Sequence, residues 1–168
     1  MPSPTTALPA VHDRATTREA AETWESLFRT QVALMRRFQA DDIWEELTMR
    51  EYDVLFTLST CPQGGTRLRD LNEYVLISQP SLSRMAERLE QRGLVERVPA
   101  PDDARGTIVR LTPEGARLQK EIGRKHVRTI SAYVGGALDT DELATLKGLL
   151  DKLRGAQEHL PARDGSEA

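Results

Sequence analysis

The chain has 168 residues, of which 39% are apolar and 29% charged, a composition typical of a folded globular protein with one main core. No apolar run approaches the ~20 residues of a membrane span, and the N-terminal segment lacks the pattern of a secretory signal. The lone cysteine, Cys61, excludes an internal disulfide framework and favours a reducing, cytoplasmic location. Because the formal net charge is −3, a surface for nucleic acid would have to be a local patch.

The first regular element along the chain is a long amphipathic helix. It follows residues 1–14, which are rich in proline and small polar residues and are expected to form a disordered arm. Thr16 and Glu19 have the spacing of a capping box, which predicts the start of the helix. The helix ends near Ala40, and its apolar stripe comprises Trp24, Leu27, Phe28, Leu34, Met35 and Phe38.

Three further helices are predicted, and the last two are joined by a short connection. Thr48 and Glu51 form a second capping signal, and the helix that follows stops before Pro62 and a glycine turn at 64–65. A short helix then covers about residues 67–74. Three residues later Ser78 is a good N-cap for a helix that ends at Gly93. Helix, three-residue connection and helix is the plan of a helix-turn-helix.

The pattern then changes to that of a β-hairpin followed by two more helices. Residues 94–98 and 107–111 are predicted strands, separated by a charged, proline-bounded loop over 99–106. Thr112 and Pro113 begin a helix that continues to about Val134. Asp139 with Glu142 caps the last helix, whose apolar face comprises Leu143, Leu146, Leu149, Leu150 and Leu153. Residues 159–168 are expected to be a disordered tail.

The helix over 79–91 separates its side chains into an apolar and a polar face. At about 100° per residue, Leu82, Met85, Ala86 and Leu89 cluster on one side. The opposite side and its flanks carry Pro80, Ser81, Ser83, Arg84, Glu87, Arg88 and Gln91. Arginine can bind guanine O6 and N7, glutamine can pair with adenine, and serine can contact phosphate or base edges. The sequence therefore indicates a DNA-recognition helix, while the solvated face of an ordinary helix is the alternative.

The loop of the hairpin carries a candidate contact to the minor groove. Its single arginine, Arg105, is suited to a narrow groove with strong negative potential. Asp103 could orient the guanidinium through a charge-assisted contact. A plain charged turn is the alternative at this position.

Residues 78–115, SQPSLSRMAERLEQRGLVERVPAPDDARGTIVRLTPEG, resemble the multiple-antibiotic-resistance regulator (MarR) family. The likeness lies in four features. They are the serine-rich start of the helix, the L-x-x-R-G-L-V-x-R segment where the helix ends and the first strand begins, the D-x-R wing, and the L-T-x-x-G segment where the next helix begins. It implies that Asp103 and Arg105 form a wing and that a recognition helix carries the remaining DNA contacts, Ser78, Gln79, Pro80, Ser81, Ser83, Arg84 and Arg88. Ala104 departs from the family, where many members have a second arginine.

The resemblance implies a mainly α fold with a small β-hairpin wing, in which a winged helix-turn-helix domain is flanked by dimerisation helices. The expected ranges are a dimerisation helix over 15–45, the winged domain over 46–112 and C-terminal dimerisation helices over 113–158. The implied function is a ligand-responsive repressor that binds a pseudo-palindromic operator as a homodimer. A protein-interaction module without DNA binding is the alternative function, and a monomer with a helical cap is the alternative assembly.

Further interpretations concern ligands and chemistry. The resemblance suggests that Trp24 stacks on a small aromatic or phenolic effector with Asp53 as its acidic partner, and a core or interface aromatic is the alternative. Cys61 is interpreted as an ordinary core thiol, and a peroxide sensor is the alternative. His126 lacks neighbours at metal-ligand spacing, and we expect it at the surface or at an interface. No enzyme, cofactor or metal motif is found, so we expect neither catalysis nor a cofactor.

Overall fold

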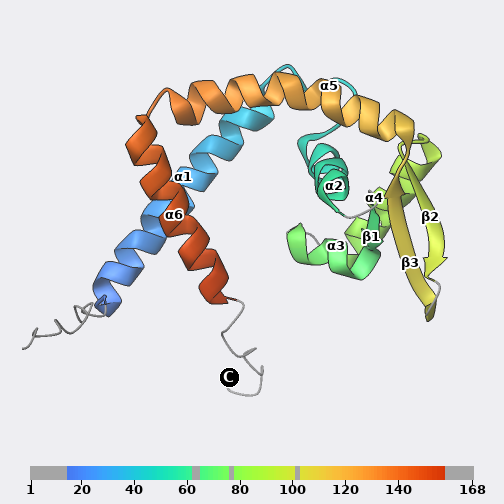
Figure 1. The fold of residues 1–168 in the computed structure, drawn as a ribbon, viewed down its shortest axis with the longest axis horizontal. Coiled ribbons are helices and arrows are strands. Elements are labelled where there is room, and N and C mark those ends of the chain that lie inside the picture. Colours follow the sequence, from blue (N-terminus) through green and yellow to red (C-terminus); the bar gives the residue numbers. More distant parts are fainter. Residues whose placement is uncertain (1–14, 62–64, 76–77, 101–102, 158–168) are drawn as a thin grey trace, which may run out of the picture. The chain divides into compact units, whose positions relative to one another are not determined.

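The computed structural model describes residues 15–61, 65–75, 78–100 and 103–157 (Figure 1), so the predicted arm and tail lie outside these ranges. The chain divides into two compact units, and the boundary between them in the sequence lies between Ala40 and Asp41. The fold is mainly helical with one small antiparallel sheet, as the sequence predicted. In the described ranges, no helix combines the length and apolar character needed to cross a membrane. The elements are α1 (Thr17–Ala40), α2 (Met49–Thr60), β1 (Gly65–Arg67), α3 (Leu68–Tyr74), α4 (Gln79–Gln91), β2 (Val95–Ala100), β3 (Asp103–Leu111), α5 (Pro113–Ile130), the π-helical turn η2 (Ser131–Gly135) and α6 (Thr140–Gln157).

The first unit contains α1, which begins at the predicted capping box. The Thr16 hydroxyl accepts the amide N–H of Glu19 at 3.2 Å, and the Glu19 carboxylate accepts the amide N–H of Thr16 at 2.7 Å. Most of the helix is exposed, including the large apolar side chains of Trp24, Phe28 and Met35. A stripe of this kind is expected to pack against another surface.

The second unit holds the core, which lies between α2, α3, α4, the sheet and the first half of α5. The predicted capping box of α2 is present, and Thr48 and Glu51 form both of its hydrogen bonds. The side chains that are less than 2% exposed are Leu47, Val54, Leu55, Leu58, Leu71, Leu82, Leu89, Val95 and Val109. The core therefore includes the apolar face that the sequence periodicity predicted for α4, which comprises Leu82, Met85, Ala86 and Leu89.

The sheet has a third strand that the sequence analysis missed. Its strand order is β1-β3-β2, and Thr66 of β1 pairs with Val109 of β3. The prediction of a glycine turn at 64–65 is therefore wrong at Gly65, which begins β1. A Cβ on Gly65 would lie 2.9 Å from the Val109 carbonyl oxygen, so a side chain there would obstruct the close approach of the two strands.

The hairpin is longer than predicted. β2 continues through Pro99 to Ala100, and β3 begins at Asp103, so residues 103–106 are strand residues rather than loop residues. Pro99 pairs with Thr107 and Ala100 with Asp103, which places a register shift between these two pairs. Such an irregularity bends and twists a ribbon locally. Proline at the end of β2 is tolerated because β2 is an edge strand.

The turn from α4 into β2 has the geometry of a Schellman motif. Gly93 has a φ of +70°, its N–H bonds to the Glu90 carbonyl at 2.8 Å, and the Leu94 N–H bonds to the Leu89 carbonyl at 2.9 Å. Thr112, the N-cap of α5, donates its hydroxyl to the Gly93 carbonyl at 2.7 Å. The end of the predicted recognition helix is thereby fixed against the start of α5.

The two C-terminal helices begin where the sequence predicted. Thr112 accepts the N–H of Gly115 at 3.0 Å, and Asp139 accepts the N–H of Glu142 at 2.9 Å. The helical path from Pro113 ends with η2 at Gly135, close to the expected end at Val134. Of the predicted apolar face of α6, four leucines are exposed by 37–60%: Leu146, Leu149, Leu150 and Leu153.

Candidate nucleic-acid interface

The helix α4 is anchored by one face and leaves the other face free. Leu82, Met85, Ala86 and Leu89 are all buried, and their surroundings include α3 and β2. The opposite face carries Arg84, Glu87 and Gln91, whose side chains are exposed. Both faces are as the periodicity of 79–91 predicted. An anchored helix with a free polar face is the arrangement by which helix-turn-helix proteins enter the major groove.

The N-terminus of α4 presents three exposed residues, Ser78, Gln79 and Pro80. Ser78 is the N-cap, as predicted, but its hydroxyl does not cap a backbone N–H and instead donates to the Ser81 hydroxyl at 2.9 Å. Ser81 and Ser83 are half-buried at the flanks of the helix. The helix start therefore offers hydroxyl and amide groups at the positive end of its dipole, where a phosphate is favoured.

The arginines around α4 differ in their partners. Within the described part of the chain, Arg84 forms no ion pair. The Nε of Arg88 lies 4.0 Å from Oε1 of Glu51, and Nη1 of Arg92 lies 3.8 Å from Oε2. Arg92 also donates to the Glu46 carbonyl. Arg84 is thus the arginine of α4 that can reach a base without leaving a carboxylate.

Glu51 is a partner of α4 that was not predicted from the sequence. Its side chain is only 10% exposed, and Oε2 accepts the amide N–H of Thr48 at 2.9 Å as well as facing Arg92. A buried carboxylate must be hydrogen-bonded and paired because its desolvation is costly. Glu51 therefore links the start of α2 to the C-terminal half of α4.

A second ionic arrangement joins α4 to the sheet. The Arg97 Nε lies 2.7 Å from Oε2 of Glu90, and its backbone N–H donates to Oε1 at 3.0 Å. The Nη1 of the same guanidinium lies 3.4 Å from Oε1 of Glu87. The hydrogen bond from Arg97 lowers the pKa of the Glu90 carboxyl.

The predicted wing residues are placed only by their backbone. Asp103, Ala104 and Arg105 lie at the start of β3, next to the register shift in the hairpin. Their side chains lie outside the described part of the structure. The prediction that Asp103 orients Arg105 for the minor groove stays a prediction.

The two predicted effector residues belong to different compact units. Trp24 is 64% exposed on α1, and its ring stacks on that of Phe28 with centroids 6.0 Å apart. Asp53 lies on the exposed side of α2, and partial burial of its carboxyl raises its pKa. Their assignment to a phenolic effector stays a prediction.

Cys61 is not among the buried core residues, contrary to the prediction, and His126 is partly buried. Cys61 is half-buried after the end of α2, its Sγ donates to the Thr57 carbonyl at 3.3 Å, and burial raises the pKa of the thiol. A raised pKa disfavours the reactive thiolate. His126 lies in an aromatic cluster with Trp44 and Tyr52. Among the described residues, no group of three or more histidine, cysteine or acidic side chains could hold a metal ion.

The helix-turn-helix of α3 and α4 is preceded by β1 and followed by the long hairpin of β2 and β3, and the three strands form one antiparallel sheet. This arrangement defines a winged helix-turn-helix protein. The sequence model of the MarR family matches residues 47–107. The multiple antibiotic resistance protein MarR of Salmonella typhimurium is 34% identical over 108 residues, which are 64% of this chain and 74% of the relative. The HTH-type transcriptional regulator FarR of Neisseria gonorrhoeae is 29% identical over 134 residues, which cover 80% and 90% of the two chains. The chain belongs to the MarR family.

Solved structures of other MarR proteins have the same fold. A cysteine-to-serine variant of MarR from Escherichia coli, complexed with operator DNA, superposes with a TM-score of 0.68 at 25% identity over 83% of this chain and 99% of its own. Sco3205 of Streptomyces coelicolor, in complex with DNA, superposes with a TM-score of 0.72 at 24% identity over 91% of this chain and 95% of its own. Members of the family are transcription regulators and not enzymes, in agreement with the prediction from the sequence.

Proposed function

We propose that the chain is a sequence-specific transcription regulator that binds a pseudo-palindromic operator as a homodimer and represses the adjoining genes. The exposed Arg84 carries this proposal, because it forms no ion pair with any carboxylate that the structure describes and lies opposite the face of α4 that is anchored in the core. An arginine held in this way can bind guanine in the major groove. Membership of the MarR family supports the same function. A regulator of operators works where the DNA is, so the proposal includes a cytoplasmic location.

The wing and the flanking helices complete the proposed binding mode. Arg105, near the tip of the hairpin, would enter the minor groove beside the site of α4, with Asp103 orienting it. The exposed apolar stripes of α1 and α6 would pack against their copies in a two-fold dimer. Two-fold symmetry would then place two copies of α4 on half-sites about one DNA turn apart.

The experiment is a selection of bound fragments from genomic DNA, followed by gel shifts at several salt concentrations. We expect log K to fall with log salt by several units of slope, because each neutralised phosphate contributes about 0.9. Arg84→Ala should weaken operator binding by about 1–3 kcal/mol and relax the sequence preference, whereas Arg105→Ala should weaken all sequences more evenly.

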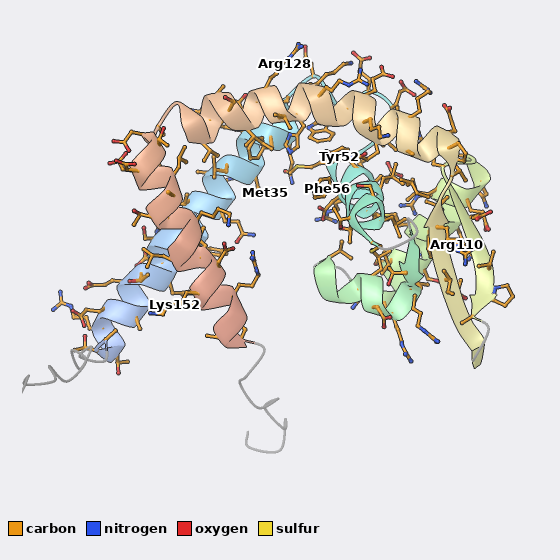
Figure 2. All side chains as sticks on the ribbon, viewed as in Figure 1. Met35, Tyr52, Phe56, Arg110, Arg128 and Lys152 are labelled. Carbon is orange, nitrogen blue, oxygen red and sulfur yellow. The ribbon has the colours of Figure 1, made fainter. Side chains whose placement is uncertain are left out.

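Arg128→Ala is a matched control, since Arg128 is an exposed arginine of α5 outside the proposed interface (Figure 2). It should leave the sequence preference unchanged. If Arg84→Ala and Arg105→Ala both bind like the parent chain, the protein is the alternative winged-helix interaction module. The net charge of −3 and the carboxylates of Glu87 and Glu90 favour that alternative.

The same assay tests the proposed response to an effector. Trp24 presents an exposed ring, and small aromatic or phenolic anions are the class of ligand proposed for it. Benzoate and salicylate added to the preformed complex should release the operator, and Trp24→Leu, which keeps an apolar side chain in the stripe of α1, should reduce this release relative to the variant's own operator affinity without the ligands. Equal release from both proteins would remove Trp24 from the effector site.

A further inference from the structure

We infer that Arg97 masks the carboxylates of Glu87 and Glu90, so that the C-terminal half of α4 does not repel the phosphates of bound DNA. This inference rests on the proposed operator binding by α4. It assigns to the DNA-binding surface a positioning residue that lies on β2 rather than on the recognition helix.

Charged side chains are unevenly distributed along α4. Its N-terminal half carries one charged side chain, Arg84, which is exposed and without an ion pair within the described ranges. The C-terminal half carries Glu87 and Glu90, while the positive charge of Arg88 faces the buried Glu51. Without a further cation, this half of the helix would carry two uncompensated carboxylates, Glu87 on the outer face and Glu90 on the flank beside β2.

Arg97 of β2 lies beside both of these carboxylates. Its guanidinium reaches both carboxylates, with Nε 2.7 Å from Glu90 Oε2 and Nη1 3.4 Å from Glu87 Oε1. The backbone N–H of Arg97 bonds to the second oxygen of Glu90 at 3.0 Å, which fixes that carboxylate between the helix and β2. The Arg97 side chain is 30% exposed, so the ion pair with Glu90 is partly shielded from solvent.

The contacts of Arg97 change the charge that α4 presents to bound DNA. Arg97 offsets one of the two negative charges and holds Glu90 toward the sheet, which leaves Glu87 partly neutralised. Like charges at a protein–DNA interface slow association and weaken affinity, and salt screens the effect. A mask of this kind would explain how a helix with one carboxylate on its outer face and another on its flank can bind a polyanion.

The test is a double-mutant cycle on operator affinity, with Arg97→Gln, Glu87→Gln and Glu90→Gln in the full chain. Arg97→Gln keeps a side-chain donor for Glu90 but removes the charge. It should weaken binding roughly three- to tenfold at about 0.1 M salt and less at about 0.3 M, where screening is stronger. Adding Glu87→Gln and Glu90→Gln to Arg97→Gln should restore most of the lost affinity. Arg97→Lys, which keeps the charge, should bind within about twofold of the parent chain.

Three outcomes would overturn the inference. Arg97→Gln could bind as well as the parent chain. The loss of operator affinity in Arg97→Gln could persist after both glutamates are neutralised, which would mean that Arg97 contacts DNA directly or only stabilises the fold. Glu87→Gln alone could raise affinity tenfold or more, which would mean that Glu87 is not masked, and this measurement does not depend on the folding of any Arg97 variant. If the parent chain itself binds no operator, the proposed function fails instead.

Discussion

Gly115 of α5 lies directly against the backbone carbonyl of Leu94, at the turn that ends the Schellman motif of α4. A Cβ built on Gly115 would overlap the carbonyl oxygen and lie 2.9 Å from the carbonyl carbon. The Thr112 N–H bonds to the same carbonyl oxygen at 3.1 Å. The approach of α5 to the end of α4 therefore requires glycine at this position, which gives the L-T-x-x-G segment a physical reason.

Gly115→Ala should destabilise the protein, because the added methyl group must displace backbone rather than a flexible side chain. Overpacking of this kind costs about 1–3 kcal/mol, measured as a lower midpoint in urea unfolding. Gly148→Ala is the matched control, since Gly148 lies in α6 and a Cβ there meets nothing within 4 Å among the described residues. It should be neutral or stabilise by up to about 1 kcal/mol through helix propensity. Equal stability of the two variants would contradict the role of Gly115.

Glu51 should stabilise the fold through both its hydrogen bonds and its charge, so removing both should cost more stability than removing the charge alone. Glu51→Ala removes half of the capping box and leaves Arg88 and Arg92 without their carboxylate, so we expect a loss of about 1–3 kcal/mol. Glu51→Gln keeps an oxygen that can accept the Thr48 N–H and removes only the charge, so it should lose less. Thermal unfolding of the two variants and of Thr48→Ala ranks the three by the stability that each loses. A loss in Glu51→Gln equal to that in Glu51→Ala would mean that the charge alone matters.

How much could be predicted from the sequence depended on how far apart the interacting residues lie in the chain. The capping at Thr48, the glycine at the end of α4 (Gly93) and the proline after Thr112 depend on residues that are adjacent in the sequence, and each was predicted correctly. The strand β1 was missed because three residues carry too short a pattern, and pairing with β3 holds them. The partners of Arg97 could not be predicted either, since the turn at Gly93 brings β2 back beside α4.

The same limit applies to the candidate site. The faces of α4 follow from periodicity, so Leu82 and Arg84 were assigned to the correct sides of the helix. Which arginine has no carboxylate partner among the described residues could not be read from the sequence, because Arg84 and Arg88 are of the same type and one turn apart. The difference between them is Glu51, which approaches Arg88 from α2.

His126 should make the stability of the fold depend on pH. Its ring lies edge-on to Trp44 and Tyr52, with centroids 5.2 and 5.6 Å away, and burial lowers its pKa although the charge of Asp41 acts in the opposite direction. Because the folded state then holds its proton less tightly than the unfolded chain, whose histidine pKa is about 6.5, stability should be constant above that pH. It should fall as the pH drops below about 6.5, since the unfolded state then binds the additional proton.

The comparison that isolates this effect is His126→Asn, which removes the titrating ring, measured by urea unfolding at about pH 7.5 and about pH 5.5. The variant should lose less stability on acidification than the parent chain. Asp41→Asn should lose more, because the carboxylate that supports the protonated ring is gone while an oxygen remains for the Tyr133 hydroxyl, which donates to Asp41 at 2.7 Å. The same pH dependence in all three proteins would show that His126 does not contribute.

The exposed leucines of α6 should be necessary for assembly. Leu149 is 60% exposed, and burying a leucine fully is worth about 1.5–3 kcal/mol, so a charge in its place should weaken self-association by roughly tenfold or more. We expect the parent chain to sediment as a dimer at micromolar concentration and Leu149→Glu to shift toward the monomer mass. Ala144→Glu is the control, because Ala144 is exposed two positions before Leu146 and successive residues are about 100° apart, which puts it on the opposite side of the helix. A parent chain that sediments as a monomer would remove the two-fold arrangement from the proposed function, and loss of the dimer in both variants would mean that the apolar stripe is not the surface that dimerises.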